Sequence, residues 1–513
     1  MPTSLVDLPI ELLPNILAPL VRRRDLYHAC LVSREFYRVA RVLLYRSIRL
    51  FGRDLSIVTR LFEVLASAPP IAHLVRRLEV RVYPLSLILK ERRAMEDLAI
   101  RALKNCTNVE ELVWTRKGSL TDSALETIVK LPRLHTFEFN AHTNLSPGSW
   151  SASLLVDLPV LRSLSLILPD RNVAVTLPAL LSRQRDLVRS REGDPSAGLA
   201  LEELSMLCRE STVINDRVVS DLAPYLANSR LRSLGLAGCS RLTAAPLLQL
   251  LPTLPHLRNL ALEACQLDPT FYSLVAPALS NLCSLKLTHP GPRHPSLSTF
   301  FPALESLLEH TTHLTAFTLY HSGASASDSR EWPTVPQGFI ENLTNSVGRN
   351  LRKFEVSGVL ISVDAVESLA RGSNGIRDLV LHLGTEYDLG HLASCFAHLS
   401  SLRTLHLLSQ RPDVYPNDVL GLAEQCSPTL RQIGFRNRVW LIRRTFESPS
   451  SDDAGGRARD GERIKIRFIE TAAAFGAFRR NRYGAEEDVE IEPDSDEERE
   501  AGSDGGSSDD EAV

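Results

Sequence analysis

One apolar pattern organises most of the chain. A six-residue pattern with leucine or another apolar residue at its first, fourth and sixth positions recurs thirteen times between Val75 and Phe435. Side chains alternate between the two faces of a strand, so each copy predicts a short strand with one apolar face. Segments between the copies, such as those beginning at Ala124 and Asp364, have apolar residues at helical spacing and end near Pro or Gly. The copies are VRRLEV, VEELVW, LHTFEF, LRSLSL, LEELSM, LRSLGL, LRNLAL, LCSLKL, LTAFTL, LRKFEV, IRDLVL, LRTLHL and LRQIGF.

The spacing of these copies predicts a solenoid. Most copies follow one another after about 25 to 28 residues, and longer intervals mark insertions. A strand-helix unit of this length buries its apolar side only against its neighbours, so the units must stack. The pattern resembles the leucine-rich repeat, with Cys239 and Cys265 at the place where the family turns a Cys or Asn to the interior. The resemblance implies an α/β horseshoe over residues 51–445, and two polar insertions, 182–198 and 321–338, are expected to be surface loops.

The first fifty residues carry a helical pattern instead. Apolar residues recur every fourth position from Leu8 to Leu20, and Pro14 and Pro19 predict that this helix is short or kinked. Asp25 is expected to open a second helix, and Ser33 is the expected N-cap of a third. A segment of about forty residues needs a metal, disulfides or a partner for stability. Because this segment holds no cysteine cluster, we expect a partner protein to complete it.

These helices resemble the F-box motif. The resemblance is carried by the Leu8-Pro9 start, the Asp25-Leu26 step, and the Val32-Ser33 step before an aromatic pair, although Phe36 stands where many members have tryptophan. It implies that residues 1–50 dock on a Skp-type adaptor and, through it, on the cullin of a ubiquitin ligase. The alternative is an ordinary helical cap on the solenoid. The residues expected at or under the adaptor contact are Leu8, Pro9, Leu12, Ile16, Leu17, Leu20, Leu26 and Val32.

The end of the chain is predicted to be different in kind. Residues 446–483 are expected to hold strands that cap the last repeat, because VWLIRRTF and RIKIRFIE alternate apolar and polar residues on either side of a polar loop. Residues 484–513 are expected to form a disordered acidic tail, with fourteen Asp and Glu against one Arg. The rest of the chain then carries a net charge of about +10. Without basic blocks interleaved with aromatic residues, this excess does not predict nucleic-acid binding.

Composition and motifs argue against chemistry of the chain's own. The eight cysteines are scattered and never form a C-x-x-C pair, so no zinc site or disulfide framework is predicted. No phosphate-binding glycine loop and no H-E-x-x-H or G-x-S-x-G motif occurs, so we expect neither a cofactor nor an enzyme. No apolar run reaches about 18 residues, and the N-terminus lacks the basic start of a signal peptide. We therefore expect a soluble protein of the cytoplasm or nucleus, without a membrane partner.

The predicted working surface is the inner face of the solenoid. Between the buried leucines of each strand, one residue points to the opposite face. We predict that an unidentified target protein binds along this row, chiefly through Ser205, Lys286, Thr318, Glu355 and His406. The predicted function is a substrate-recognition subunit of a Skp-cullin-F-box ligase, similar to many F-box proteins of fungi; the alternative is a leucine-rich-repeat scaffold or inhibitor outside any ligase. The full row is Glu79, Val113, Glu138, Ser165, Ser205, Gly235, Ala261, Lys286, Thr318, Glu355, Val380, His406 and Gly434.

Overall fold

The computed structural model describes residues 10–20, 23–50, 55–83, 89–143, 150–265, 267–290, 294–321, 332–409, 411–447 and 463–470. The chain divides into two compact units, Met1–Leu430 and Arg431–Val513. Several predictions lie outside the described residues: those for Leu8 and Pro9, most of the loop predicted at 321–338, the loop at 448–462, and the acidic tail.

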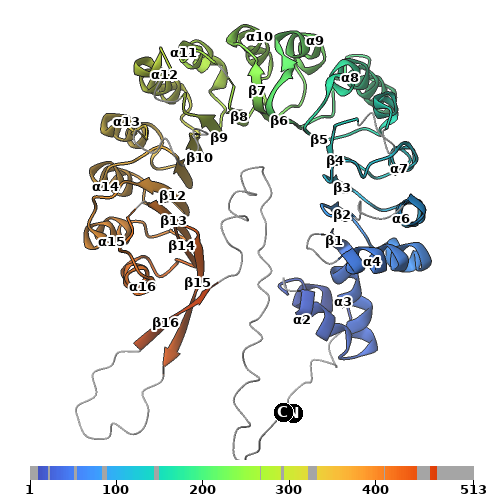
Figure 1. Ribbon diagram of the computed structural model, residues 1–513, viewed down its shortest axis with the longest axis horizontal. Helices are drawn as coiled ribbons and strands as arrows, with labels where there is room; N and C mark the ends of the chain where they lie inside the picture. Colours follow the sequence, from blue (N-terminus) through green and yellow to red (C-terminus); the bar gives the residue numbers. More distant parts are fainter. Residues whose placement is uncertain are drawn as a thin grey trace, which may run out of the picture. The chain divides into compact units, whose positions relative to one another are not determined.

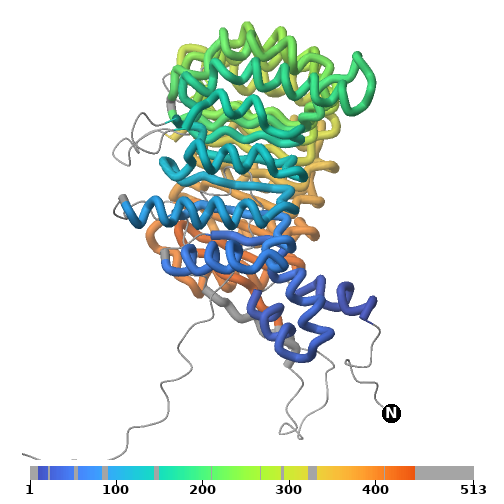
Figure 2. Tube along the Cα trace, turned by 90° about the vertical axis from the view of Figure 1, so that its right-hand side faces the viewer, coloured from blue at the N-terminus to red at the C-terminus, as the bar shows by residue number. Residues whose placement is uncertain are grey.

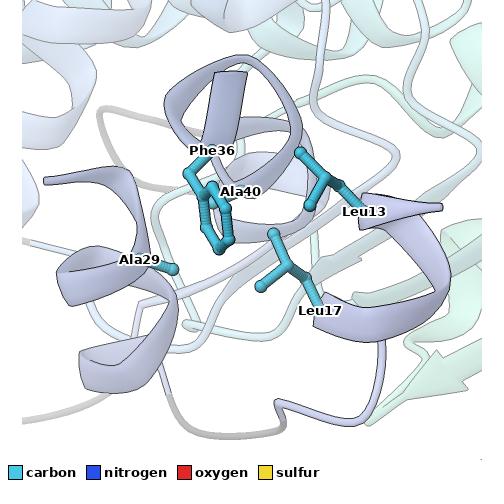
Figure 3. Packing of buried hydrophobic residues seen from close by; sticks show 5 residues of the cluster. All are labelled: Leu13, Leu17, Ala29, Phe36 and Ala40. Atoms are coloured by element: carbon cyan, nitrogen blue, oxygen red, sulfur yellow. The ribbon is translucent and has the colours of Figure 1, made fainter. Parts of the chain in front are cut away.

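Three short helices open the first unit: α1 (Leu13–Leu17), α2 (Arg23–Cys30) and α3 (Arg34–Arg46). The expected cap at the third helix is present, because the backbone N–H of Phe36 donates to Ser33 Oγ at 3.2 Å. The first helix is short, as its prolines predicted. The second begins two residues before Asp25, which lies in its first turn. Figure 3 shows the small core that joins the three helices: Leu13, Leu17, Ala29, Phe36 and Ala40.

Thirteen strands of the first unit form one parallel sheet in sequence order, each pairing with the next. Every predicted copy of the apolar pattern is a strand, from β2 onward, and the leucines face the helices. In β5, for example, Leu164 and Leu166 are buried while Ser163 and Ser165 are partly exposed. The strands are β1 (Ser47–Leu50), β2 (Arg77–Val80), β3 (Glu111–Trp114), β4 (Thr136–Asn140), β5 (Ser163–Ile167), β6 (Glu203–Asn215), β7 (Ser233–Arg241), β8 (Asn259–Glu263), β9 (Ser284–Thr288), β10 (Ala316–Tyr320), β11 (Lys353–Ser357), β12 (Asp378–Leu383) and β13 (Thr404–Ser409).

Helical segments return the chain between strands. Within Met1–Leu430 the strands line the inner side of the stacked units and the helices cover the outer side, one coil following the next (Figures 1 and 2). This is the α/β repeat architecture that the sequence predicted. The segments are α4 (Leu55–Ser67), α5 (Pro69–Ala72), α6 (Leu89–Asn105), α7 (Asp122–Ile128), η2 (Ala152–Asp157), α8 (Arg171–Glu192), α9 (Asp216–Leu226), α10 (Ala244–Leu250), η3 (Leu251–Thr253), α11 (Thr270–Val275), η4 (Ala276–Leu279), α12 (Leu297–His310), α13 (Gln337–Val347), α14 (Val363–Gly372), α15 (Leu389–Ala397) and α16 (Pro416–Gln425).

The parallel sheet begins four residues before residue 51, where the solenoid was predicted to start. β1 lies at the end of the helical segment and pairs with β2, Ser47 opposite Arg77 and Leu50 opposite Val80. The chain leaves α3 at Arg46 and enters this strand at the next residue. The helical segment and the solenoid therefore share a continuous backbone hydrogen-bond network and have no linker between them.

The loop predicted at 182–198 is wrong for most of its length. Helix α8 continues to Glu192 and ends at Gly193, whose φ of 67° provides a left-handed cap. The helix persists because the side chain of Gln184, 5% exposed, is satisfied inside the core. Its amide donates to the carbonyls of Leu158 (2.9 Å) and Pro159 (2.8 Å) and accepts from the N–H of Leu161 (2.8 Å).

The second unit holds three antiparallel strands: β14 (Gln432–Phe435), β15 (Arg438–Glu447) and β16 (Arg463–Glu470). The two alternating segments that were expected to pair do so, with Trp440 opposite Glu470 and Glu447 opposite Arg463. Their role as a cap on the solenoid remains a prediction.

Candidate functional site

The three N-terminal helices concentrate exposed apolar surface. Among the described residues thirteen large apolar side chains are exposed, and eight of them lie between positions 10 and 42. A soluble surface rarely gathers so many in a bundle this small unless another molecule covers them. The eight are Ile10, Leu12, Ile16, Tyr27, Leu31, Val32, Tyr37 and Val42.

The structure divides the predicted adaptor-contact residues into two groups. Leu12, Ile16 and Val32 are 46%, 39% and 59% exposed, so their side chains are accessible to a partner. Leu17 and Leu26 are 3% and 6% exposed and are therefore buried under that surface. Leu20 is partly buried and packs against the core cluster shown in Figure 3. The apolar stripe read from the sequence thus serves two purposes, since one side holds the bundle together and the other faces solvent.

The inner face of the solenoid shows the row that the strand pattern predicted. Twelve of the predicted positions, from Glu79 to His406, lie in the first unit. Each of them is paired in register with the predicted position on a neighbouring strand. Of the five residues singled out for target binding, Thr318 and His406 are only 6% and 4% exposed. The role of all five in binding stays a prediction.

Lys286, Glu355 and Glu79 on this inner row already have charged partners. Lys286 Nζ lies 2.9 Å from the carboxylate of Glu263, and Glu355 lies 3.4 Å from Lys353. Glu79, 3% exposed, is paired with Arg81 and lies 3.7 Å from both Arg49 and Arg77. A ligand for these charges must therefore compete with an ion pair inside the protein.

Buried histidines lie along or beside the inner face. Burial lowers the pKa of His289, His382 and His406 to about 4, with the nearby His321 as a second cause for His289. The N–H of Gly358 donates to Nδ1 of His382 at 3.0 Å, which requires that nitrogen to be unprotonated. These side chains are neutral near pH 7, so the inner face gains no positive charge from them.

A second row of residues, which the sequence analysis did not single out, follows the edge where the strands begin. We call it the amino-edge row. It consists of the second residue of each six-residue copy from VRRLEV to LRTLHL, preceded by Arg46, the residue before β1, and backbone hydrogen bonds of 2.7 to 2.8 Å join its members from Arg232 to Arg403. The signal was present in the sequence, since Arg recurs directly after the first apolar residue in most copies. The row is Arg46, Arg76, Glu110, His135, Arg162, Glu202, Arg232, Arg258, Cys283, Thr315, Arg352, Arg377 and Arg403.

The two halves of the amino-edge row differ in charge. In the earlier half, Arg76 pairs with Glu110 at 3.1 Å, and Glu202, the last residue of that half, pairs with Arg232 at 3.5 Å, where the later half begins. The row holds no acidic residue after Glu202. The later half is therefore cationic while the earlier half is largely neutralised within the row.

A hollow of about 560 Å³ opens on this edge between β7 and β11. It is lined on the row itself by Arg232, Arg258, Cys283 and Thr315, with polar residues of the preceding turns around them. Cys283 and Thr315 stand where other repeats carry Arg, and their short side chains leave the space open. The other lining residues are Pro255, His256, Asn281, His313 and Asn350.

The fold defines a repeat protein with an N-terminal segment of three helices. Residues 5–50 match the F-box-like family, so the chain carries an F-box-like domain there. No curated protein matches the chain.

Many solved structures are similar to this chain in part. Three of them are the leucine-rich repeat-containing protein LegL7 from Legionella pneumophila (14% identity, 69% of this chain and 97% of that one, TM-score 0.38), the Rad7 and Elc1 complex in yeast (14%, 81% and 97%, 0.38) and the TLR13-ssRNA13 complex (15%, 67% and 56%, 0.32).

The described part of the chain lacks two features, a membrane-spanning helix and a metal site. No helix in that part of the chain combines the length and apolar character needed to span a membrane. Nor do three or more His, Cys, Asp or Glu side chains converge there in a way that suits a metal ion.

Proposed function

We propose that this chain is the substrate-recognition subunit of a Skp-cullin-F-box ubiquitin ligase. The F-box-like domain docks on a Skp-type adaptor and the solenoid binds a target protein. The observation that supports the proposal best is the set of exposed apolar side chains on α1 to α3, next to a core that is already complete without them. Burial of such surface against a partner is favourable because it removes apolar area from water.

In this function the chain positions the target protein within the ligase. The solenoid holds the target at a fixed distance from the adaptor, and the ligase brings a charged ubiquitin carrier to the same assembly. Holding two reactants together raises their effective concentration without any reacting group from the receptor. The direct passage from α3 into β1 favours this role, since it ties the docking segment to the first strand of the sheet.

Affinity capture from cells with the proteasome inhibited tests the proposal. Wild type is compared with the variant Leu12→Ser/Ile16→Ser/Val32→Ser, which keeps the buried core. We expect adaptor and cullin to be recovered with the wild type and lost with the variant, while target proteins bound to the solenoid are recovered with both. If the wild type recovers no adaptor, the proposal is wrong and the scaffold alternative explains the fold better.

A further inference from the structure

The amino-edge row carries more positive charge in its later half than the chain itself neutralises. Arg352, Arg377 and Arg403 directly precede three adjacent strands, β11, β12 and β13, and each is linked to the next by a backbone hydrogen bond of 2.7 or 2.8 Å. Neighbouring strands are about 4.8 Å apart, so three residues of like charge follow one another along this edge. All three are exposed.

Few partners within the chain offset these arginines. Arg352 Nη1 donates to the carbonyl of Gly375 at 3.1 Å, and neither Arg377 nor Arg403 makes a side-chain ion pair with a described residue. The acidic neighbours are Asp378, which follows Arg377 in the chain, and Glu355, which is paired with Lys353 at 3.4 Å. The local balance is therefore positive.

The hollow extends the same edge toward the middle of the sheet. Arg258 lines it, is exposed, and makes no side-chain ion pair with a described residue. Arg232 lines it as well, and its carboxylate partner Glu202 is 3.5 Å away on the side toward β6. A planar guanidinium binds a carboxylate through two parallel hydrogen bonds, so each of these arginines can hold one acidic side chain.

The geometry points to the amino edge from Arg232 to Arg403 as a docking surface for a segment of the target protein that is rich in Asp and Glu. That the acidic segment belongs to a ligase target rests on the proposed function. Charge complementarity selects an acidic occupant, and the repeated spacing of the arginines along the edge fits several carboxylates in succession better than one isolated anion. Nucleic acid is less suited, because the row from Arg232 to Arg403 has no Phe, Tyr or Trp on which a base could stack.

The test measures binding of the purified full-length chain to a fluorescein-labelled dodecapeptide in which Glu and Ser alternate, by fluorescence anisotropy. The variant Arg352→Gln/Arg377→Gln/Arg403→Gln is compared with Arg46→Gln/Arg76→Gln/Arg162→Gln, which removes the same charge from the earlier half of the row. We expect the first variant to weaken binding about 10-fold or more and the second less than about 3-fold. Binding should also weaken as NaCl rises from about 50 to about 300 mM.

Several results would overturn the inference. One is equal weakening by both variants, which would show a response to net charge alone. Another is equally tight binding of a dodecapeptide with Gln in place of Glu. A third is tighter binding of a fluorescein-labelled oligothymidylate than of the acidic peptide, together with weaker oligothymidylate binding by the first variant. That result would assign the edge to nucleic acid.

Thermal unfolding confirms that both variants are folded, and adaptor binding is measured on the same preparations. Failure of the wild-type chain to bind the acidic peptide, with its adaptor binding intact, disproves this inference alone. Loss of adaptor binding in the wild type disproves the proposed function instead.

Discussion

Replacing the exposed apolar residues of the F-box-like domain should abolish docking without unfolding the bundle. Leu12, Ile16 and Val32 are 46%, 39% and 59% exposed, so an adaptor that covers them removes that much of each side chain from water. Full burial of a side chain of this size contributes about 1.5 to 3 kcal/mol. Scaled by these exposed fractions, the three together contribute about 2 to 4 kcal/mol, or roughly 30- to 1,000-fold in Kd.

The assay is isothermal titration calorimetry of the purified chain with a Skp-type adaptor. The matched control replaces three apolar residues of the solenoid that are at least as exposed, Ile57→Ser/Val175→Ser/Leu274→Ser, at 59%, 73% and 65%. We expect the control to bind like the wild type and the N-terminal variant to fall within the range above. A Kd for the N-terminal variant within about 3-fold of wild type would refute the reasoning, as would equal losses in the two variants.

Three further predictions concern the solenoid and use urea unfolding. Gln184→Leu removes three buried hydrogen bonds and leaves backbone groups unpaired, so it should lower the free energy of unfolding by about 2 to 5 kcal/mol, while the exposed Gln337→Leu changes it by less than about 0.5 kcal/mol; equal effects would contradict the role of Gln184. Gly358→Ala should lower the free energy of unfolding by about 1 to 3 kcal/mol, because φ at this position is 72° and the added Cβ would lie 2.7 Å from the carbonyl oxygen of His321. In the control Gly384→Ala the added Cβ meets no atom within 4 Å. An unchanged free energy of unfolding for Gly358→Ala would show that the turn relaxes. Burial lowers the pKa of His382 to about 4 from 6.5. Between these two pH values the unfolded chain therefore binds more protons than the folded chain. The stabilisation from a neutral, buried His382 is present above pH 6.5 and is lost as the pH falls toward 4. The stability difference between wild type and His382→Gln should therefore shrink by about 1 kcal/mol from about pH 7.5 to about 5.5, and a gap that does not change with pH would contradict the burial of a neutral imidazole.

Much of the fold could be predicted because the repeat has a period of two residues within each strand. Alternation alone determines which side chain faces inward, so the row from Glu79 to His406 could be placed before any contact was known. The first strand escaped notice for a local reason. Its six-residue copy begins with Tyr45 and overlaps the last turn of α3, so the helical pattern concealed it.

The end of helix α8 was predicted as a loop because residues 182–198 are mostly polar and include Gly, Pro and Ser, and even its core position Gln184 is polar. Gln184 occupies the place of an apolar residue, and its three partners precede it by 23 to 26 residues in the chain. In the sequence this polar residue interrupts the apolar spacing of the helix, whereas in the structure its side-chain amide is hydrogen-bonded inside the core. Long-range hydrogen bonds of this kind depend on packing and cannot be read from spacing.

The candidate sites show the same limits. The stripe from Leu8 to Leu20 predicted an interface, but which of its residues point into the bundle depends on how α1 packs against α3. Lys286 and Glu355 were predicted as contacts for a target, and both have charged partners within the chain. The amino-edge row was visible as a recurring Arg, yet its unequal halves emerge only when the strands are aligned side by side.

Assembly of the ligase can be measured by size-exclusion chromatography of the full-length chain with a preformed adaptor-cullin complex. We expect the chain to co-elute with adaptor and cullin in equal stoichiometry, and Leu12→Ser/Ile16→Ser/Val32→Ser to elute separately while still folded. Separate elution of a folded wild-type chain at concentrations well above micromolar would contradict the proposed function.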